Sequence, residues 1–175
     1  LLLADAKTGK ILKKIASTAT DSHLDQLNGI ESSGAWSPDS KRYAFDAYEK
    51  GRSVLVVKDV ERNKTVEKIY IPGVPSFSNP AWSPDGKTIV VSGQVNGQTD
   101  LYAYNVKSKK VQRLTNDRAS EILPTWSPDG KTIAYSTDAL SLQRGRTNGA
   151  WTMNLALLDV AADTSVQIGI FPGAD

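Results

Sequence analysis

A short motif that recurs at a nearly fixed distance constrains the fold of this chain more than any other feature. The letters W-S-P-D-G/S-K begin at Trp36, Trp82 and Trp126, which lie 46 and 44 residues apart. A period in the forties is the length of one four-stranded propeller blade or of one HEAT-like pair of helices. The period therefore leaves two architectures, and the chemistry of the motif must decide between them.

The motif has the composition of a tight β-turn. A Pro-Asp pair, followed by Gly in two copies and by Ser40 in the first, precedes a β-branched or aromatic run such as residues 88–91. Proline presets φ, aspartate caps the turn, and glycine adopts the left-handed conformation from which the return strand starts. Paired helices would not tolerate Pro and Gly there, so the motif predicts a hairpin. The turn residues are Pro38, Pro84, Pro128, Asp39, Asp85, Asp129, Gly86 and Gly130.

A second hairpin follows each motif. An apolar strand ends at Asp59, Asn105 or Asp159, a polar turn follows, and another strand returns. The stretch LLLADAKTGKILKKI fits the same template, so fourteen strands are expected. We predict an all-β fold, a β-propeller of four-stranded antiparallel blades forming a partial ring of about 3.5 blades. The template gives one partial propeller domain over residues 1–175, with a blade remnant at 1–20 and blades at about 33–74, 79–117 and 123–171.

The composition excludes several classes of protein. Lys and Arg number 21 against 19 Asp and Glu, and this near-balance predicts no basic face for nucleic acid. No run of eighteen apolar residues is present to span a membrane. Without cysteine the chain has neither a thiolate metal site nor a disulfide scaffold. Because the sequence has no initiator Met and no signal peptide, we expect it to be a piece of a longer protein.

The repeat resembles the TolB-type (WD40-like) β-propeller repeat. The resemblance rests on W-S-P-D-G-K-x-I-x-[FYV], on the Pro in NPAWSPDG and LPTWSPDG, and on the later L-T-N-D, and it covers nearly the whole chain. Similar blades occur in the periplasmic TolB protein of the Tol envelope system, in prolyl-oligopeptidase-like peptidases and in large bacterial envelope proteins. The resemblance therefore implies a fold but not one function. Complete rings of this family usually have six or more blades, which puts ring closure by this chain alone in doubt.

The repeated residues are interpreted as structural. Trp36, Trp82 and Trp126 end the first strand of each blade, where a large ring can fill the space between neighbouring sheets. Stacking of a ligand on these rings is the alternative. The three Asp residues of the motif are interpreted as turn-formers and not as catalytic carboxylates. The motif is thus a folding device, and function is expected where the repeats differ.

Two insertions distinguish the repeats. The first inter-blade connection carries about eight to ten extra residues, and the third blade carries a ten-residue insertion between its second and third strands. In an up-and-down blade these two places share one rim of the disc, while the tight turns share the other. Loops lengthened on one face of a rigid scaffold are the usual place for binding. We therefore expect binding through the face that carries loops 18–34 and 138–151.

The first long loop contains an alternating polar triplet. Asp21, His23 and Asp25 would project to one side of an extended segment, which is the arrangement of a mixed nitrogen and oxygen metal site. The competing interpretation is a polar surface loop, and we favour it. No metal site is predicted.

Four further residues are binding candidates on the same face. Glu31 and Glu121 each lie five residues before a Trp, where Phe77 stands in the middle blade. They could form an acidic channel mouth for a cationic group or a peptide amine, and solvated rim carboxylates are the favoured alternative. Arg144 and Arg146 could clamp a carboxylate or phosphate, with a mobile basic loop as the commoner interpretation.

No catalytic motif is found in the sequence. It lacks a G-x-S-x-G nucleophile elbow, H-E-x-x-H and a Gly-rich phosphate loop, and His23 is its only histidine. We therefore predict that the chain is not an enzyme and needs no cofactor. If the parent protein is a peptidase, its catalytic domain is expected outside this chain.

Two functions remain. The favoured one is non-catalytic protein–protein interaction in a bacterial envelope or secreted protein, with a protein or peptide partner and a periplasmic or secreted location. The remaining blades would come from the parent chain or from self-association. The alternative is the substrate-gating propeller domain of a prolyl-oligopeptidase-like serine hydrolase. A downstream α/β domain with a serine elbow would distinguish the two.

Overall fold

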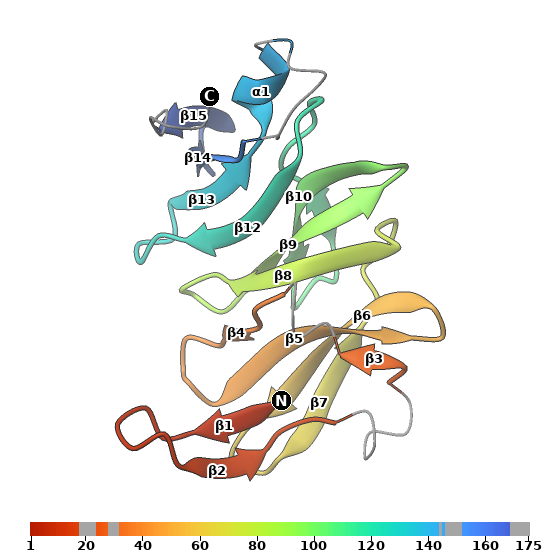
Figure 1. The fold of residues 1–175 in the computed structure, drawn as a ribbon, viewed down its shortest axis with the longest axis vertical. Coiled ribbons are helices and arrows are strands. Elements are labelled where there is room, and N and C mark those ends of the chain that lie inside the picture. The colour runs from red at the N-terminus through yellow and green to blue at the C-terminus, as the bar shows by residue number, and fades with distance from the viewer. Residues whose placement is uncertain (18–23, 28–31, 144, 146–151, 169–175) are drawn as a thin grey trace.

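The strands form successive antiparallel sheets stacked along the long axis of the molecule (Figure 1). The computed structural model describes residues 1–17, 24–27, 32–143, 145 and 152–168. Within these residues the chain forms one two-stranded sheet and three larger sheets. We call the two-stranded sheet the remnant sheet, and the larger sheets blades 1, 2 and 3 in chain order.

The remnant sheet and blade 1 occupy one end of the stack (Figure 1). Lys13 attaches the remnant sheet to blade 1, because its Nζ donates to the carbonyl oxygens of Val60 and Glu61 at 3.0 and 2.8 Å. The remnant sheet consists of β1 (Leu2–Ala4) and β2 (Ile11–Lys14). Blade 1 consists of β3 (Gln26–Leu27), β4 (Ala35–Trp36), β5 (Arg42–Glu49), β6 (Arg52–Asp59) and β7 (Lys64–Ile69).

Blades 2 and 3 are regular four-stranded sheets in which sequential strands pair. Blade 2 consists of β8 (Ser76–Trp82), β9 (Thr88–Val95), β10 (Gln98–Asn105) and β11 (Val111–Arg113). Blade 3 consists of β12 (Glu121–Trp126), β13 (Thr132–Thr137), β14 (Asn154–Asp159) and β15 (Thr164–Ile168), with the short helix α1 (Ala139–Gln143) after β13.

The core lies between the blades and not within any one of them. Successive residues of a strand point to opposite faces of a sheet. Val91 of β9 accordingly packs with Leu55 of blade 1, whereas its neighbour Val90 packs with Ile133 of blade 3. All four side chains are fully buried. The apolar run of β9 is therefore explained by a strand that has a neighbouring blade on each side.

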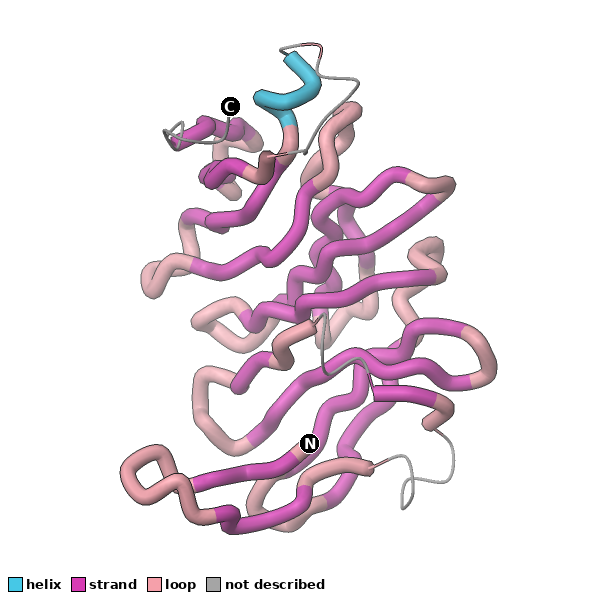
Figure 2. The backbone as a smooth tube through the Cα atoms, in the orientation of Figure 1, coloured by secondary structure: helices cyan, strands magenta, loops and turns pink. Residues whose placement is uncertain are grey.

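The connections gather on two opposite faces (Figure 2). We call the face with the W-S-P-D turns and the β10–β11 turn the turn face; it lies at the left edge of Figures 1 and 2. We call the other face, with the β5–β6 and β9–β10 turns, the loop face. The chain between β13 and β14, which contains α1, also starts and ends on the loop face.

The all-β propeller fold predicted from the repeat is confirmed, with one difference in the strand count. The described residues contain fifteen strands and not fourteen, because β3 and β4 each pair with a different part of β5. Gln26 opposes Tyr48 at the loop-face end of β5, and Trp36 opposes Tyr43 near its other end. The first long connection thus contributes its own piece to the inner edge of blade 1. Among the described residues, no helix has the length and hydropathy required to cross a membrane.

Candidate functional site

The first long loop is fastened to blade 1 through Asp25. The backbone N–H of Asp25 donates to the carbonyl of Tyr48 at 2.7 Å. Its carboxylate accepts a 3.3 Å hydrogen bond from the N–H of Gly51, in a β5–β6 turn where Lys50 and Gly51 both have positive φ. Asp25 therefore holds the turn and the loop together. In this position it serves the loop face as an anchor.

Five of the predicted binding residues lie outside the described residues. These are Asp21, His23, Glu31, Arg144 and Arg146. Among the residues that are described, no group of three or more His, Cys, Asp or Glu side chains is placed to hold a metal ion.

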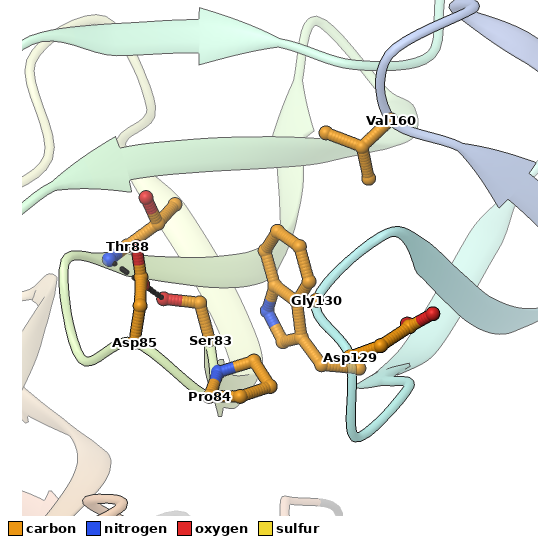
Figure 3. A pocket seen from close by; sticks show the side chains of 8 residues that line it. Ser83, Pro84, Asp85, Thr88, Asp129, Gly130 and Val160 are labelled. Atoms are coloured by element: carbon orange, nitrogen blue, oxygen red, sulfur yellow. Dashed lines mark hydrogen bonds between the residues drawn. The ribbon is translucent and has the colours of Figure 1, made fainter.

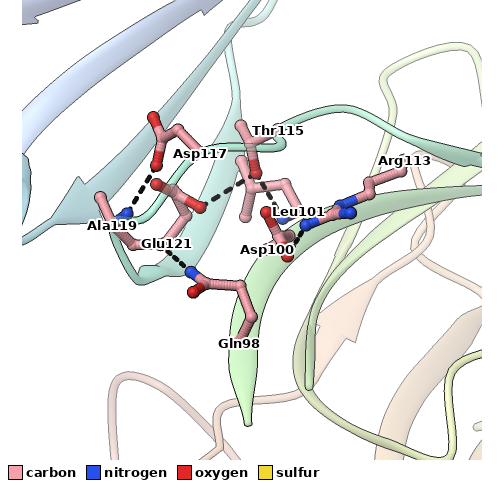
Figure 4. A network of polar contacts seen from close by, with 8 residues as sticks. All are labelled: Gln98, Asp100, Leu101, Arg113, Thr115, Asp117, Ala119 and Glu121. Atoms are coloured by element: carbon pink, nitrogen blue, oxygen red, sulfur yellow. Dashed lines mark hydrogen bonds and ion pairs between the residues drawn. The ribbon is translucent and has the colours of Figure 1, made fainter. Parts of the chain in front are cut away.

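Glu121, the remaining candidate, belongs to a polar network between blades 2 and 3 (Figure 4). Its Oε2 accepts a 3.0 Å hydrogen bond from the hydroxyl of Thr115. The same hydroxyl accepts the N–H of Leu101 at 2.9 Å, which ties the inter-blade connection to β10. Gln98, also in β10, donates to the carbonyl of Ala119 in that connection. The network therefore joins β10, the connection and the start of β12 at the loop face.

Burial sets the protonation of Glu121. The side chain is 1% exposed, so the expectation of a solvated rim carboxylate is wrong for this residue. Its pKa is raised to about 8, first by burial and then by the negative charges of Asp117 and Asp100, against the hydrogen bond from Thr115. At neutral pH the group is therefore largely protonated. It contributes little negative charge to a channel mouth.

Asp100 is a second buried carboxylate in the same network. Its Oδ2 pairs with Nη2 of Arg113 at 2.6 Å, whereas its Oδ1 is buried without a hydrogen-bond partner. Burial raises the pKa of Asp100, and the guanidinium of Arg113 opposes that rise. The network at the loop face thus contains two buried carboxyl groups, and one oxygen of Asp100 has no hydrogen-bond partner. No sequence pattern indicated this arrangement.

The inner strands carry a feature that the sequence analysis missed. Asn79 in β8 and Leu123 in β12 have φ of 52° and 57°, at the register shifts where each strand pairs with the next. Each residue precedes a proline, and each N–H is held by a serine of the preceding blade, at 2.8 Å for Asn79 and 3.2 Å for Leu123. The dipeptides Asn-Pro and Leu-Pro before the Trp residues were the sequence signal from which these bulges could have been predicted. These bulges line a groove of about 360 Å³ along the inner strands.

The turn face is built from three nearly identical turns. The residue after the motif Asp has φ of 57° at Ser40 and 71° at both Gly86 and Gly130. Each Asp carboxylate accepts the hydroxyl of the motif Ser at 2.6 Å and the N–H of the motif Lys at 3.0–3.1 Å. These bonds lower the pKa of the carboxyls, the serine hydroxyl contributing most. Pro38 and Pro84 of one turn lie within van der Waals reach of a Cβ at Gly86 and Gly130 of the next.

The three tryptophans differ in their surroundings. Trp126 donates its indole N–H to the carbonyl of Ala81 at 3.2 Å, and so bridges blades 3 and 2. Trp82 packs against the apolar cluster shared by blades 1 and 2, and its indole nitrogen is buried without a hydrogen-bond partner. Trp36 is 46% exposed and contacts Tyr43 edge-on at 5.2 Å. The idea that every ring fills a space between sheets is therefore wrong for Trp36 among the described residues, where its ring contact is with Tyr43 of its own blade.

Stacked antiparallel blades with apolar cores between them define this molecule as a β-propeller protein. The sequence profile of the TolB beta propeller domain matches residues 19–147. The chain belongs to that family.

Relatives of two kinds match the chain over about half its length. The Tol-Pal system protein TolB of Ruthia magnifica is 37% identical over 86 residues, which cover 49% of this chain and 20% of that protein. Dipeptidyl-peptidase 5 of Aspergillus fumigatus is 30% identical over 88 residues, which cover 47% of this chain and 12% of that protein. The chain therefore corresponds to a minor part of the length of either relative.

Solved structures support the same fold. The crystal structure of TolB from Acinetobacter baumannii superposes with a TM-score of 0.60 at 23% identity, covering 81% of this chain and 32% of that chain. The putative TolB from Agrobacterium tumefaciens gives a TM-score of 0.63 at 17% identity, covering 80% of this chain and 50% of that chain. At these identities the likeness concerns the fold alone.

Proposed function

We propose that the chain is a non-catalytic protein-binding propeller of a bacterial envelope or secreted protein, and that it binds through the loop face. One observation carries this proposal: the described ends of both long loops, 18–34 and 138–151, lie at the loop face, whereas the connections described on the turn face are short turns. Rigid scaffolds usually bind through such lengthened loops. The relation to a Tol-Pal system protein supports a protein as the partner and the periplasm or the exterior as the location.

The bases of both loops are anchored, which supports their presentation from a fixed frame. Asp25 holds the first loop to the β5–β6 turn. The carboxylate of Asp138, which precedes α1, accepts the N–H of Ser120 at 2.7 Å. Within the insertion, Ser141 Oγ accepts the N–H of Thr152 at 3.1 Å. Anchored bases reduce the conformational entropy that a partner must remove on binding.

The proposal assigns no catalytic group to this chain. The two carboxyls whose pKa is raised, Glu121 and Asp100, are buried and belong to the network that joins blades 2 and 3. A structural polar network perturbs pKa values as a catalytic site does. Here the hydrogen bonds to Thr115 and Arg113 give each carboxyl a structural role.

A matched pair of photo-crosslinking positions tests the proposal. Gln94 and Lys107 are both exposed in blade 2, at the loop-face end of β9 and in the β10–β11 turn of the turn face. A photoreactive amino acid at Gln94, introduced in the native host, should give an adduct with a separate protein. The same group at Lys107 should not give that adduct. No adduct from Gln94 or from neighbouring loop-face positions would contradict the proposal.

The second candidate, the gating propeller of a prolyl-oligopeptidase-like hydrolase, is favoured by the match to a dipeptidyl-peptidase. The same experiment separates the two functions. In a gating propeller, the loop-face probe would crosslink to an α/β domain of its own polypeptide. Mass spectrometry of the crosslinked peptides identifies which of the two has formed.

A further inference from the structure

Two clefts of related construction open on the turn face, each between the W-S-P-D turns of neighbouring blades. Cleft 1–2, between blades 1 and 2, has a volume of about 200 Å³, and cleft 2–3, between blades 2 and 3, has about 400 Å³. Each is lined by the Pro and Asp of one turn and by the Trp of the following blade. Figure 3 shows cleft 2–3 with Asp85 and Asp129 on neighbouring turns, and Trp126 also lines this cleft.

The linings of the two clefts differ at one equivalent position. Arg42 begins β5 and lines cleft 1–2, while Thr88 begins β9 and lines cleft 2–3. The two residues are equivalent, because each donates its backbone N–H to the motif serine, to Ser37 at 2.9 Å and to Ser83 at 3.0 Å. The chain thus places an arginine at the edge of the smaller cleft and only a short hydroxyl side chain at the larger one.

The carboxylates of the two turns, Asp39 and Asp85, also differ in the positive charges near them. Asp39 in cleft 1–2 experiences the positive charges of both Arg42 and Lys41, which help to lower its pKa. The equivalent Asp85 has Lys87 alone, at 3.3 Å and with both side chains more than half exposed to water. An ion pair of that kind is weak. Lys87 is therefore the cation whose charge lowers the pKa of Asp85, although Asp85 lines cleft 1–2 beside Arg42 as well as cleft 2–3.

We propose that cleft 2–3 receives an arginine side chain of a protein partner, in the place that Arg42 of the chain itself takes in cleft 1–2. A guanidinium is planar, stacks on aromatic faces and donates to carboxylates in a fork. Trp126 supplies the aromatic wall, held by its bond to Ala81, and Asp85 supplies the carboxylate. This site lies on the turn face, so it is distinct from the loop-face binding proposed above.

The test uses a small probe and its neutral isostere. N-acetyl-arginine amide is titrated into the protein while the indole N–H signals of the tryptophans are followed by NMR, and N-acetyl-citrulline amide is the control without charge. We expect the arginine probe to shift the Trp126 signal saturably and the Trp82 signal hardly at all. The citrulline probe should bind more weakly, by up to about fivefold, which is the upper end of the range for an exposed charge pair.

Reciprocal variants test whether residues 42 and 88 decide which cleft binds the arginine probe. Arg42→Thr should open cleft 1–2 and give Trp82 a response to the arginine probe, while Thr88→Arg should fill cleft 2–3 and remove the response of Trp126. Asp85→Asn should weaken binding at Trp126 by about fivefold. Asp39→Asn, which lines only cleft 1–2, should leave it unchanged.

Three results would overturn the proposal. These are equal responses to the two probes, no saturable shift of Trp126, and an Arg42→Thr protein in which Trp82 stays silent. Thr88→Arg is interpreted only if its unfolding midpoint matches that of the wild type. The Arg42→Thr result does not depend on that variant, so the proposal stays testable if Thr88→Arg fails to fold.

Discussion

At the scale of single residues, the residue that follows the Asp of each W-S-P-D motif has a left-handed backbone. It is Ser40 in one turn and Gly in the others. A residue with a Cβ pays roughly 1–2 kcal/mol in this conformation. We expect Ser40→Gly to be neutral or stabilising and Gly86→Val to cost more than about 1 kcal/mol. Since a Cβ at Gly86 meets nothing closer than 3.8 Å, the cost would come from backbone strain and not from a clash. Thermal unfolding checks both variants, and a clearly destabilised Ser40→Gly protein would contradict the turn geometry.

Glu121 gives a prediction about pH at the same scale. Its pKa in the folded protein is about 8, above the ordinary 4.5, so the folded state binds more protons than the unfolded state between these values. The free energy of unfolding should therefore fall as pH rises through this window, by up to about 1.4 kcal/mol per unit from this group. Glu121→Gln keeps an acceptor for Thr115 and removes the titration.

The measurement compares denaturant unfolding of the two proteins at several pH values. All other titratable groups are the same in both proteins, so their effects cancel in the difference. The stability difference between variant and wild type should grow in favour of the variant from about pH 5 to pH 8. A constant difference would show that Glu121 does not titrate as its burial implies.

At the scale of elements, the blade-to-blade contacts depend on the tryptophan that ends each inner strand. Trp82 packs into the apolar cluster shared by blades 1 and 2, whereas Trp36 is 46% exposed. Trp82→Ala should cost roughly 3–5 kcal/mol, the range for large aromatic truncations in a core. Trp36→Ala is the matched control and should cost clearly less. Equal losses in denaturant unfolding would argue against the inter-blade role of Trp82.

The elements also show what the sequence could and could not predict. The period of W-S-P-D and its turn chemistry were sufficient for the all-β propeller fold, because turn residues act locally. The split of the inner strand into β3 and β4 depends on pairing with the far end of β5, which no local pattern records. The environment of Glu121 depends on residues outside its own strand, since Thr115, which donates to its carboxyl group, also accepts the N–H of Leu101 in blade 2. Turns that depend on neighbouring residues can therefore be predicted from the sequence, whereas strand pairing and burial between blades cannot.

At the scale of the whole molecule, both ends of the stack expose apolar sheet faces. At one end, Leu155 and Leu157 of β14 oppose Ile168 and Val166 of β15, on the face turned away from blade 2, and Val166 is 64% exposed. At the other end, Leu2, Ile11 and Leu12 of the remnant sheet are more than half exposed. Neighbouring blades bury such faces elsewhere in the same molecule. Apolar patches of this kind mark surfaces that associate.

We therefore expect the 175-residue chain alone to self-associate and to bind a hydrophobic dye, unless further blades of a parent protein cover both ends. Light scattering over a concentration series should show a mass that rises with concentration. Val166→Lys should weaken this association by placing a charge on the end face. Val66→Lys is the matched control, because Val66 is similarly exposed but lies on β7 of blade 1 and not on the end face of blade 3. A monodisperse monomer without dye binding would show that the end faces need no partner, and an equal effect of both lysines would show that association does not use the end face.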